Sequence, residues 1–437
     1  MKLRLPLLPV AAALAVTAAL AQTAPPAPAT PRPPAVTSVA GTVSAIEARW
    51  RLADYPGAAR LLKAVPAAQA ADPRLQVFSA RLDYLNGRVQ SAEHKAAAAA
   101  AKLPRGSLDR AEALDLAGRS AFMRGDYPAA APHARAQCDE LAGSGLHETL
   151  DLLDPFCERA PAAFLSSFRA ARTPQVLSPI HEAPMQPRRP TVSSVINGVQ
   201  SAVLVDTGAE SSAMLSRDAD ALGVRRTGFT TTIQGFTTDR VPVEWGVIDT
   251  LDLAGWRLRD VPVIILPNVF PPGALPAPLL LGLNELWPFR TTFDYPAGRF
   301  RLERSHGPLV PGKDRAVALV GPALRAPLAL LGATVYATLD TGSDRLLLSQ
   351  ERLGQAGGRA PSFTGGQSGV SGVSGTLALR DAVVPEVRVL GRTLQNVPAG
   401  IAPRLPEGGG GIFGYDIVSK YRLVVDLQSE GMVLANP

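Results

Sequence analysis

The stretch AVLVDTG at residues 202–208 has a counterpart further along the chain, YATLDTG at residues 336–342. In both stretches, apolar or β-branched residues precede an Asp-Thr-Gly tripeptide, which is the pattern of a strand that ends in a tight loop. A hairpin signal, Asn197-Gly198 in one case and Gly332 in the other, stands at the same distance before each aspartate. We therefore expect each aspartate on a strand-end loop, where the glycine permits a sharp turn and the threonine hydroxyl can hydrogen-bond.

Two further landmarks repeat in the same order. The sequence LLG at residues 280–282 recurs as IFG at residues 412–414, and FDY at residues 293–295 recurs as VDL at residues 425–427. Three landmarks in one order and with nearly the same spacing in both copies indicate a duplicated domain. The short β-branched runs broken by Gly, Pro and Asn indicate that each copy is all-β.

With these landmarks, the chain resembles the aspartic protease clan that includes retropepsins and pepsins. The resemblance covers about Thr191 to the C-terminus, with lobe 1 at residues 191–305 and lobe 2 at residues 316–437. It implies two acid-protease-like β-lobes that share one cleft, with Asp206 and Asp340 as the catalytic pair. The residues expected to support the two active-site loops are Thr207, Gly208, Thr341 and Gly342.

The resemblance also implies a flap, a hairpin that closes over the substrate. The candidates in lobe 1 are Gln234, Gly235 and Phe236, and those in lobe 2 are Ser368 and Gly369. Gly235 and Gly369 stand equally far beyond the aspartate of their own lobe, and glycine suits a mobile tip. Neither candidate tip has the tyrosine of pepsin-like flaps, and a loop without function is an equal alternative for the second.

The chemistry of the clan needs two carboxylates close together. Two carboxyls at such short range cannot both ionise, because their negative charges would repel. One carboxyl therefore keeps its proton, and the ionised partner takes a proton from a shared water. That water attacks the peptide carbonyl without a covalent acyl-enzyme, and the pair titrates as a unit. The expected function is that of an aspartic endopeptidase, and the alternative is a catalytically inactive peptide-binding or adaptor protein.

A helical domain precedes the lobes at residues 36–172, which are rich in Ala, Leu, Arg and Glu and have helical periodicity. Short turn motifs begin at Asp54, Arg88 and Asp126, at nearly regular intervals, and resemble those of tetratricopeptide repeats. Such repeats commonly hold a peptide or protein partner; a plain helical bundle is the alternative. Residues 173–190 contain five prolines and no sustained period, so we expect a linker that leaves the helical domain outside the active site.

Residues 1–21 have the pattern of a secretory signal peptide, with Lys2 and Arg4 before an apolar run and a small-x-small triplet that ends at Ala21. A Pro/Ala-rich linker follows at residues 22–35. We therefore expect an exported protein, periplasmic or secreted, without a stable membrane anchor once the signal is cleaved. Under oxidising conditions Cys138 and Cys157 could form a disulfide or remain two buried thiols, and their spacing favours neither.

Other classes of function find no support. The net charge of +6 comes from scattered arginines, so we expect no nucleic acid partner. The five histidines are dispersed and no Gly-x-Ser-x-Gly elbow occurs, so neither a metal site nor serine catalysis is expected. The glycine run at residues 409–414 lacks the βαβ context of a dinucleotide site, and no cofactor is expected. The expected fold class is multidomain α+β, with an all-α repeat domain followed by two all-β lobes.

Overall fold

The computed structural model describes residues 38–51, 54–144, 173–234, 240–306, 309, 315–317, 319–320, 323–372, 375–405, 409–429 and 431–437. The signal peptide, the Pro/Ala-rich linker, Cys157 and the flap candidates Gly235 and Phe236 lie outside these residues, so their assignments stay predictions. Residues 38–437 form one compact unit. Within the described ranges, no helix has both the length and the apolar character needed to cross a lipid bilayer.

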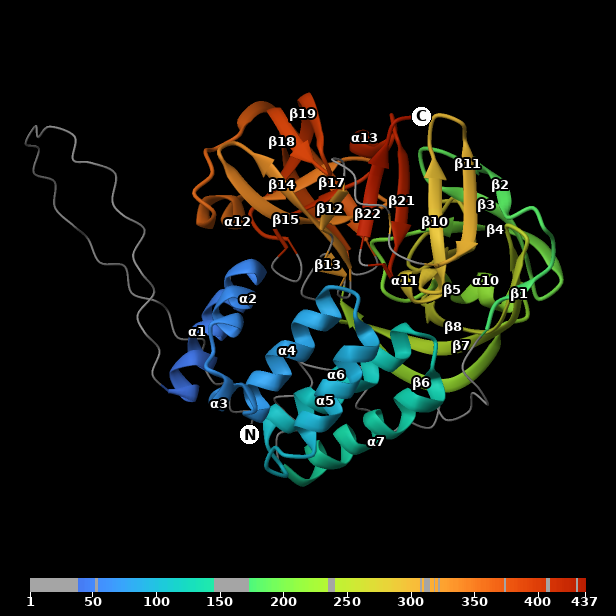
Figure 1. Cartoon of the computed structure of the whole chain (residues 1–437). Coiled ribbons are helices and arrows are strands. Elements are labelled where there is room, and N and C mark those ends of the chain that lie inside the picture. Colours follow the sequence, from blue (N-terminus) through green and yellow to red (C-terminus); the bar gives the residue numbers. More distant parts are fainter. Residues whose placement is uncertain are drawn as a thin grey trace, which may run out of the picture. The chain divides into compact units, whose positions relative to one another are not determined.

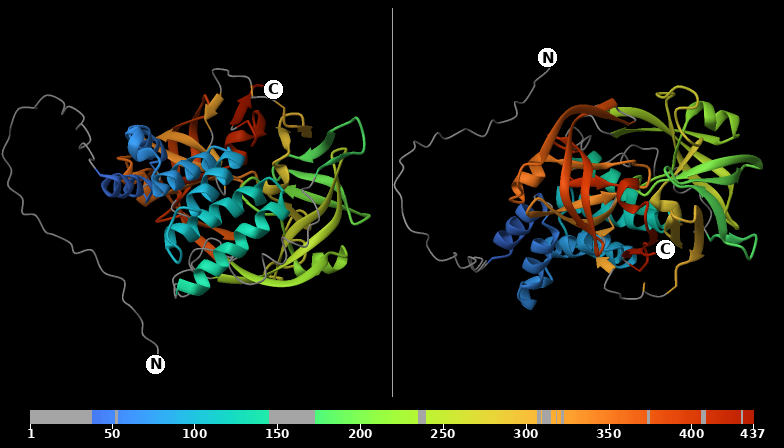
Figure 2. Two further views of the ribbon diagram at one scale, coloured as in Figure 1. Left: turned by 60° about the horizontal axis from the view of Figure 1, so that its bottom comes forward. Right: turned by 90° about the horizontal axis from the view of Figure 1, so that it is seen from above.

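The described part of the chain begins with helices that stack side by side, with α4 on α5, α5 on α6 and α6 on α7 (Figures 1 and 2). Each turn motif precedes the second helix of a pair, and Asp54 and Asp126 cap α2 and α7 by accepting hydrogen bonds from Gly57 N and Ala129 N. The tetratricopeptide likeness itself remains a prediction. The helices are α1 (Val39–Arg51), α2 (Tyr55–Lys63), α3 (Ala67–Ala70), α4 (Pro73–Leu85), α5 (Val89–Ala100), α6 (Leu108–Met123) and α7 (Tyr127–Ser144).

Two β-rich lobes follow the helices, which confirms the expected α+β fold class (Figure 1). Lobe 1 and the segment before it contain β1 (Gln175–Val176), β2 (Glu182–Gln186), β3 (Thr191–Ile196), β4 (Val199–Val205), β5 (Ala213–Leu215), α10 (Ser216–Ala221), β6 (Arg225–Gln234), β7 (Arg240–Leu253), β8 (Trp256–Leu266), β9 (Leu279–Leu281), α11 (Leu283–Leu286), β10 (Phe289–Asp294) and β11 (Arg299–Arg304). Lobe 2 contains β12 (Arg315–Val317), β13 (Leu319–Val320), β14 (Leu324–Leu330), β15 (Ala333–Leu339), β16 (Leu346–Ser349), α12 (Gln350–Gln355), β17 (Ser362–Gly372), β18 (Gly375–Val389), β19 (Arg392–Ala402), β20 (Gly411–Phe413), α13 (Tyr415–Val418), β21 (Arg422–Asp426) and β22 (Gly431–Ala435).

The two lobes repeat one topology, as the duplicated landmarks predict. In lobe 1 the hairpin β3–β4 turns at Asn197 and Gly198, and in lobe 2 the hairpin β14–β15 turns at Leu331 and Gly332, all four with positive φ. Two consecutive residues with positive φ form the tight turn whose twist suits a β-hairpin. The strand that leaves each hairpin then pairs in parallel with the apolar-apolar-Gly strand, β4 with β9 and β15 with β20.

The proline-rich segment at residues 173–190, predicted to be a linker, contributes strands to the lobe 1 sheets. Strand β1 pairs with β8, and β2 pairs with both β3 and β11. Pro184 lies within β2 opposite Arg299. Proline is tolerated in a strand where the sheet does not need the missing N–H as a donor. The two strands are also short, so no alternation of apolar and polar residues marks them in the sequence.

A sheet in the order β12-β22-β21-β10-β11-β2 joins the lobes, because β21 of lobe 2 pairs with β10 of lobe 1. Across this pairing Arg290 Nε donates to Asp426 Oδ2 at 2.9 Å, and Arg422 Nε donates to Asp294 Oδ2 at 2.9 Å. The two ion pairs are related by the sequence repeat, so the landmark aspartates exchange partners across the lobe interface. Asp426 is fully buried.

We expect Arg290→Met to lower the free energy of unfolding by about 3–5 kcal/mol, because it leaves the buried Asp426 carboxylate without its cation. The matched control is Arg388→Met, which breaks the solvent-exposed pair of Arg388 with Glu386 and should leave stability almost unchanged. Urea unfolding of both variants measures the difference. Equal effects would show that the interlobe pair does not hold the lobes together.

Candidate active site

The two Asp-Thr-Gly loops are each fastened to the apolar-apolar-Gly element of their own lobe. Asp206 N donates to Leu281 O at 3.0 Å, and Asp340 N donates to Phe413 O at 2.9 Å. The glycine that ends each element leaves room for a neighbouring backbone segment. A Cβ at Gly282 would lie 2.5 Å from Ser211 C, and one at Gly414 would lie 2.1 Å from Ser343 O. Each glycine therefore has a steric role next to the active-site loop.

The threonines of the two loops exchange hydrogen bonds across the lobe interface. Thr207 Oγ1 donates to Leu339 O at 2.8 Å and accepts from Thr341 N at 3.1 Å. Reciprocally, Thr341 Oγ1 donates to Val205 O at 2.6 Å and accepts from Thr207 N at 3.1 Å. Both threonines are fully buried. These four bonds fix the two loops relative to each other.

The exchange places the two aspartates side by side. Gly208 N donates to Asp206 Oδ1 at 2.8 Å. A Cβ at Gly208 would lie 2.5 Å from Asp340 Cγ, and a Cβ at Gly342 would lie 3.0 Å from Asp206 Oδ2, so only glycine lets each loop approach the opposite carboxyl this closely. The structure thus brings together the two aspartates, two threonines and two glycines that the sequence singled out.

The electrostatics of the pair favour a shared proton. Burial raises the pKa of Asp206, opposed by hydrogen bonds from Gly208 N, the Asp340 carboxyl and Gly342 N. Burial raises the pKa of Asp340 well above its usual range, and the negative charge of Asp206 raises it further. Since the two carboxyls are within hydrogen-bonding reach, ionising one keeps the other protonated. This is the state that water activation requires.

Three of the flap candidates lie in described strands. Gln234 ends β6 and pairs with Arg240 of β7, and the other two lobe 1 candidates lie outside the described residues. In lobe 2, Ser368 and Gly369 pair with Leu379 and Ala378, while β17 continues to Gly372. These two residues therefore lie in the arm of the hairpin and not at its tip. Because this segment contains many glycines, the sequence did not indicate that β17 extends as far as Gly372.

Ser368 also belongs to a polar cluster. Its hydroxyl donates to Asp381 Oδ1 at 2.6 Å and accepts from Arg345 Nη1 at 3.0 Å. Arg345 Nη2 donates to the same Asp381 oxygen at 2.8 Å. This cluster ties the hairpin arm to the loop that follows Asp340, and nothing in the sequence pattern indicated it.

A half-buried acid behind the lobe 2 loop was also missed. Asp416 Oδ2 accepts a hydrogen bond from Leu346 N at 2.7 Å. Burial raises the pKa of Asp416 to about 6, against hydrogen bonds from the backbone. The corresponding residue of lobe 1 is Asn284. The repeat could have revealed this difference, because the two neighbouring landmark glycines fix the alignment.

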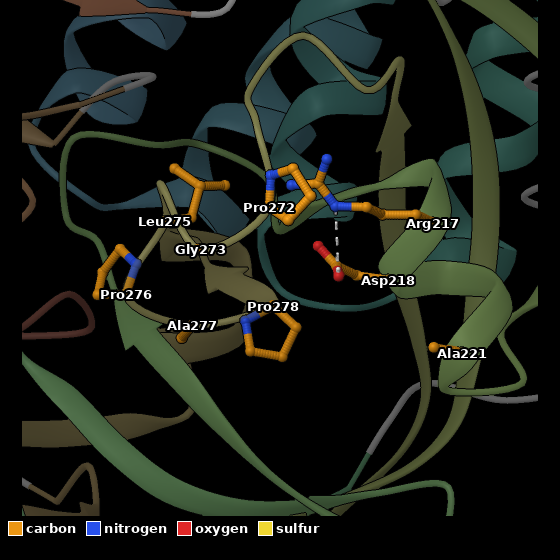
Figure 3. A pocket seen from close by; sticks show the side chains of 9 residues that line it. All are labelled: Arg217, Asp218, Ala221, Pro272, Gly273, Leu275, Pro276, Ala277 and Pro278. Carbon is orange, nitrogen blue, oxygen red and sulfur yellow. Dashed lines mark ion pairs between the residues drawn. The ribbon is translucent and has the colours of Figure 1, made fainter.

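Lobe 1 also has a pocket beside the segment that leads into β9 (Figure 3). Arg217 holds this segment by donating to Phe270 O at 2.7 Å and to Pro271 O at 3.1 Å. Neither catalytic candidate lines the pocket. Its lining residues are Arg217, Asp218, Ala221, Pro272, Gly273, Leu275, Pro276, Ala277 and Pro278. Across the part of the chain that the structure describes, no group of three or more His, Cys, Asp or Glu side chains is placed to ligate a metal ion.

Comparison with known families agrees with this geometry. A family model described as aspartyl protease matches residues 192–284 and again residues 326–417, so each match contains one Asp-Thr-Gly loop and the helix start behind it. Over these two segments the chain is therefore similar to aspartyl proteases. No curated protein matches the chain closely enough to count as a relative.

We expect Thr341→Val to lower the free energy of unfolding by about 2–5 kcal/mol, because Val205 O and Thr207 N both lose a buried partner. Thr341→Ser keeps the hydroxyl and should cost only about 1 kcal/mol for the lost methyl. Urea unfolding distinguishes the two variants. If valine were tolerated as well as serine, the exchange of hydrogen bonds would not hold the lobes in register.

Asp416→Asn should stabilise the protein at neutral pH. The folded-state pKa of about 6 exceeds the usual 3.8, so ionisation of Asp416 opposes folding. The penalty is absent below about pH 4, grows as pH rises and is complete above about pH 6, where it amounts to at most about 3 kcal/mol. The variant should therefore gain stability at pH 7 and none at pH 4, as measured by thermal or urea unfolding. A gain that is equal at both values would contradict the assignment.

Proposed function

We propose that the protein is an aspartic endopeptidase in which Asp206 and Asp340 activate one water molecule. The observation that carries this proposal is the pair of half-buried carboxyls held in one site by the reciprocal Thr207 and Thr341 hydrogen bonds. A protein that only binds peptides needs no such pairing of two acids with raised pKa. The pairing is costly, since each carboxyl taken out of water must be compensated.

In this mechanism the ionised carboxyl of the pair removes a proton from the water, and the protonated carboxyl donates to the oxygen of the scissile carbonyl. The carboxyl that took the proton from the water then gives it to the leaving amine, and the C–N bond breaks. A hydroxyl proton of the tetrahedral species returns to the other carboxyl, so the pair is again singly protonated. Asp340, whose pKa is raised the more of the two, suits the protonated role in the unliganded protein. Substrate binding can exchange the two roles because the carboxyls share one environment.

The proposal extends to cellular location and partners. The N-terminal signal pattern supports export to the periplasm or beyond, so the substrates would be peptides or proteins of that compartment. The repeat-like helices support a protein partner as a further part of the proposal. The inactive adaptor is the competing function, and the same experiment separates the two.

The test is a peptide library incubated with the purified mature protein across pH, with Asp206→Asn and Asp340→Asn as separate variants. Because one carboxyl must be protonated and the other ionised, kcat/KM should fall as pH rises past the higher apparent pKa of the pair. It should also fall at low pH, where the base is protonated. Each variant should lower kcat by about 10²- to 10⁴-fold, since both lobes of one chain form the single site.

Three outcomes would contradict the proposal. Cleavage that persists in Asp206→Asn would remove this residue from the mechanism. Substantial activity in both single variants would indicate that like lobes pair between two chains. Peptide binding without cleavage, at every pH and in the unmodified protein, would establish the adaptor.

A further inference from the structure

The acidic residue four positions after each catalytic aspartate has arginine neighbours, but these come from a different part of the chain for each lobe. In lobe 2 this residue is Asp344, which pairs with Arg188 at 3.3 Å and Arg189 at 3.5 Å. In lobe 1 the equivalent residue is Glu210. In the repeat, Arg188 and Arg189 of lobe 1 correspond to residues 322 and 323 of lobe 2, which are proline and alanine. Lobe 2 therefore has no arginine at the matching positions.

The helical domain supplies that neighbour. Arg119 of α6 lies with Nη1 4.0 Å from Glu210 Oε2, and its Nε donates to both oxygens of Asp115 at 3.0 and 2.9 Å, which holds the guanidinium in place. Tyr84 of α4 donates its hydroxyl to Glu210 Oε1 at 3.4 Å. Tyr84 is only 6% exposed, so its hydroxyl has little access to solvent as an alternative partner.

Backbone bonds and apolar packing continue from this contact to the catalytic loop. Glu210 O accepts from Asn284 N at 3.0 Å, and Ala209 O accepts from Leu283 N at 2.9 Å, so the loop after Asp206 is fastened to α11. Helix α11 contacts α6. Leu283 and Leu286 belong to the same buried cluster as Tyr84. A displacement of α4 or α6 would thus be transmitted to the residues that follow Asp206.

A second contact reaches the paired strands β6 and β7 of lobe 1, and β6 ends at the flap candidate Gln234. Phe122 of α6 packs edge-on against Trp245 of β7, with ring centroids 6.0 Å apart. Phe229 of β6 packs against the same cluster, to which Tyr127 of α7 also belongs. The helices therefore support both the loop that holds Asp206 and the arms of the hairpin β6–β7. This differs from the expectation that a proline-rich linker would leave them outside the active site.

We infer that the helical domain is a positioning element of the active site, in which Arg119 and Tyr84 hold Glu210 and thereby set the loop of Asp206. The helical domain thus provides Glu210 with the arginine contact that the corresponding positions of lobe 2, residues 322 and 323, do not provide. Arg119 and Tyr84 are positioning residues, since they act through Glu210 and do not touch the reacting atoms. The inference rests on the proposed endopeptidase function for its kinetic consequence, but its structural consequence is independent of catalysis.

The test compares Arg119→Met with Arg81→Met in the full chain. Arg81 is a matched control because it is similarly exposed, pairs with Glu112 inside the helical domain and packs over Phe78. In Arg119→Met we expect kcat to fall about 10-fold with little change in KM, because a slightly displaced loop misplaces the reacting groups. We also expect faster hydrogen exchange of the backbone amides at residues 206–212 and 282–286. Arg81→Met should change neither quantity.

The readouts separate the possible failures. If the unmodified protein cleaves no peptide, the proposed function fails, and hydrogen exchange alone decides the positioning role. If Arg119→Met matches Arg81→Met in both exchange and kcat, the inference is wrong. Should Arg119→Met not fold, Tyr84→Phe removes only one hydroxyl and must show the same local increase in exchange. The control is Tyr421→Phe, at a half-buried tyrosine just before β21 of lobe 2. An unchanged exchange pattern in Tyr84→Phe would then overturn the inference.

Discussion

The exchange of hydrogen bonds between Thr207 and Thr341 is the constraint on which the active site depends. Each hydroxyl reaches a carbonyl of the strand that ends in the opposite catalytic loop, and each accepts the amide of its counterpart. Two acids with raised pKa would otherwise repel each other, so their proximity has to be imposed by the backbone. Fully buried hydroxyls impose it well, since no water competes for them and every donor is matched. Apposed carboxyls are thus a consequence of the lobe interface.

The interlobe sheet provides the second level of the same constraint. The antiparallel pairing of β10 with β21 carries the reciprocal ion pairs of Arg290 with Asp426 and of Arg422 with Asp294. An antiparallel ladder allows only one register when charged side chains must meet across it. A fixed register there keeps the two strands that end at the catalytic loops from sliding. The landmark aspartates at residues 294 and 426 therefore repeat in the sequence for a structural reason.

The sequence predicted the parts of the site that depend on local pattern and repetition. The Asp-Thr-Gly loops, their hairpins and the glycines behind them follow from short motifs, and the structure brings all six predicted loop residues together. Contacts between distant segments left no such signal. Arg119 and Glu210 meet across the boundary between the helices and lobe 1, and neither residue stands in a motif that points to the other. Likewise, the only signal in residues 173–190 was their proline content, which predicted a linker. The two short strands in this segment pair with the lobe 1 strands and need no periodicity of their own.

Duplication within one chain also permits an asymmetry that a dimer of identical lobes cannot have. The loop after Asp206 continues with Ala209 and Glu210, and the loop after Asp340 continues with Ser343 and Asp344. Behind them, lobe 2 has Asp416 followed by Ile417, whereas lobe 1 has Asn284 followed by the fully buried Glu285, so the further acidic residue stands at a different position of the repeat in each lobe. Each difference acts on one carboxyl more than on its neighbour. Unequal surroundings favour one of the two singly protonated states, which a fully symmetric site would populate equally. The helices that contact Glu210 add to this inequality, because they support the loop of Asp206 from a part of the chain that has no counterpart in the lobe repeat.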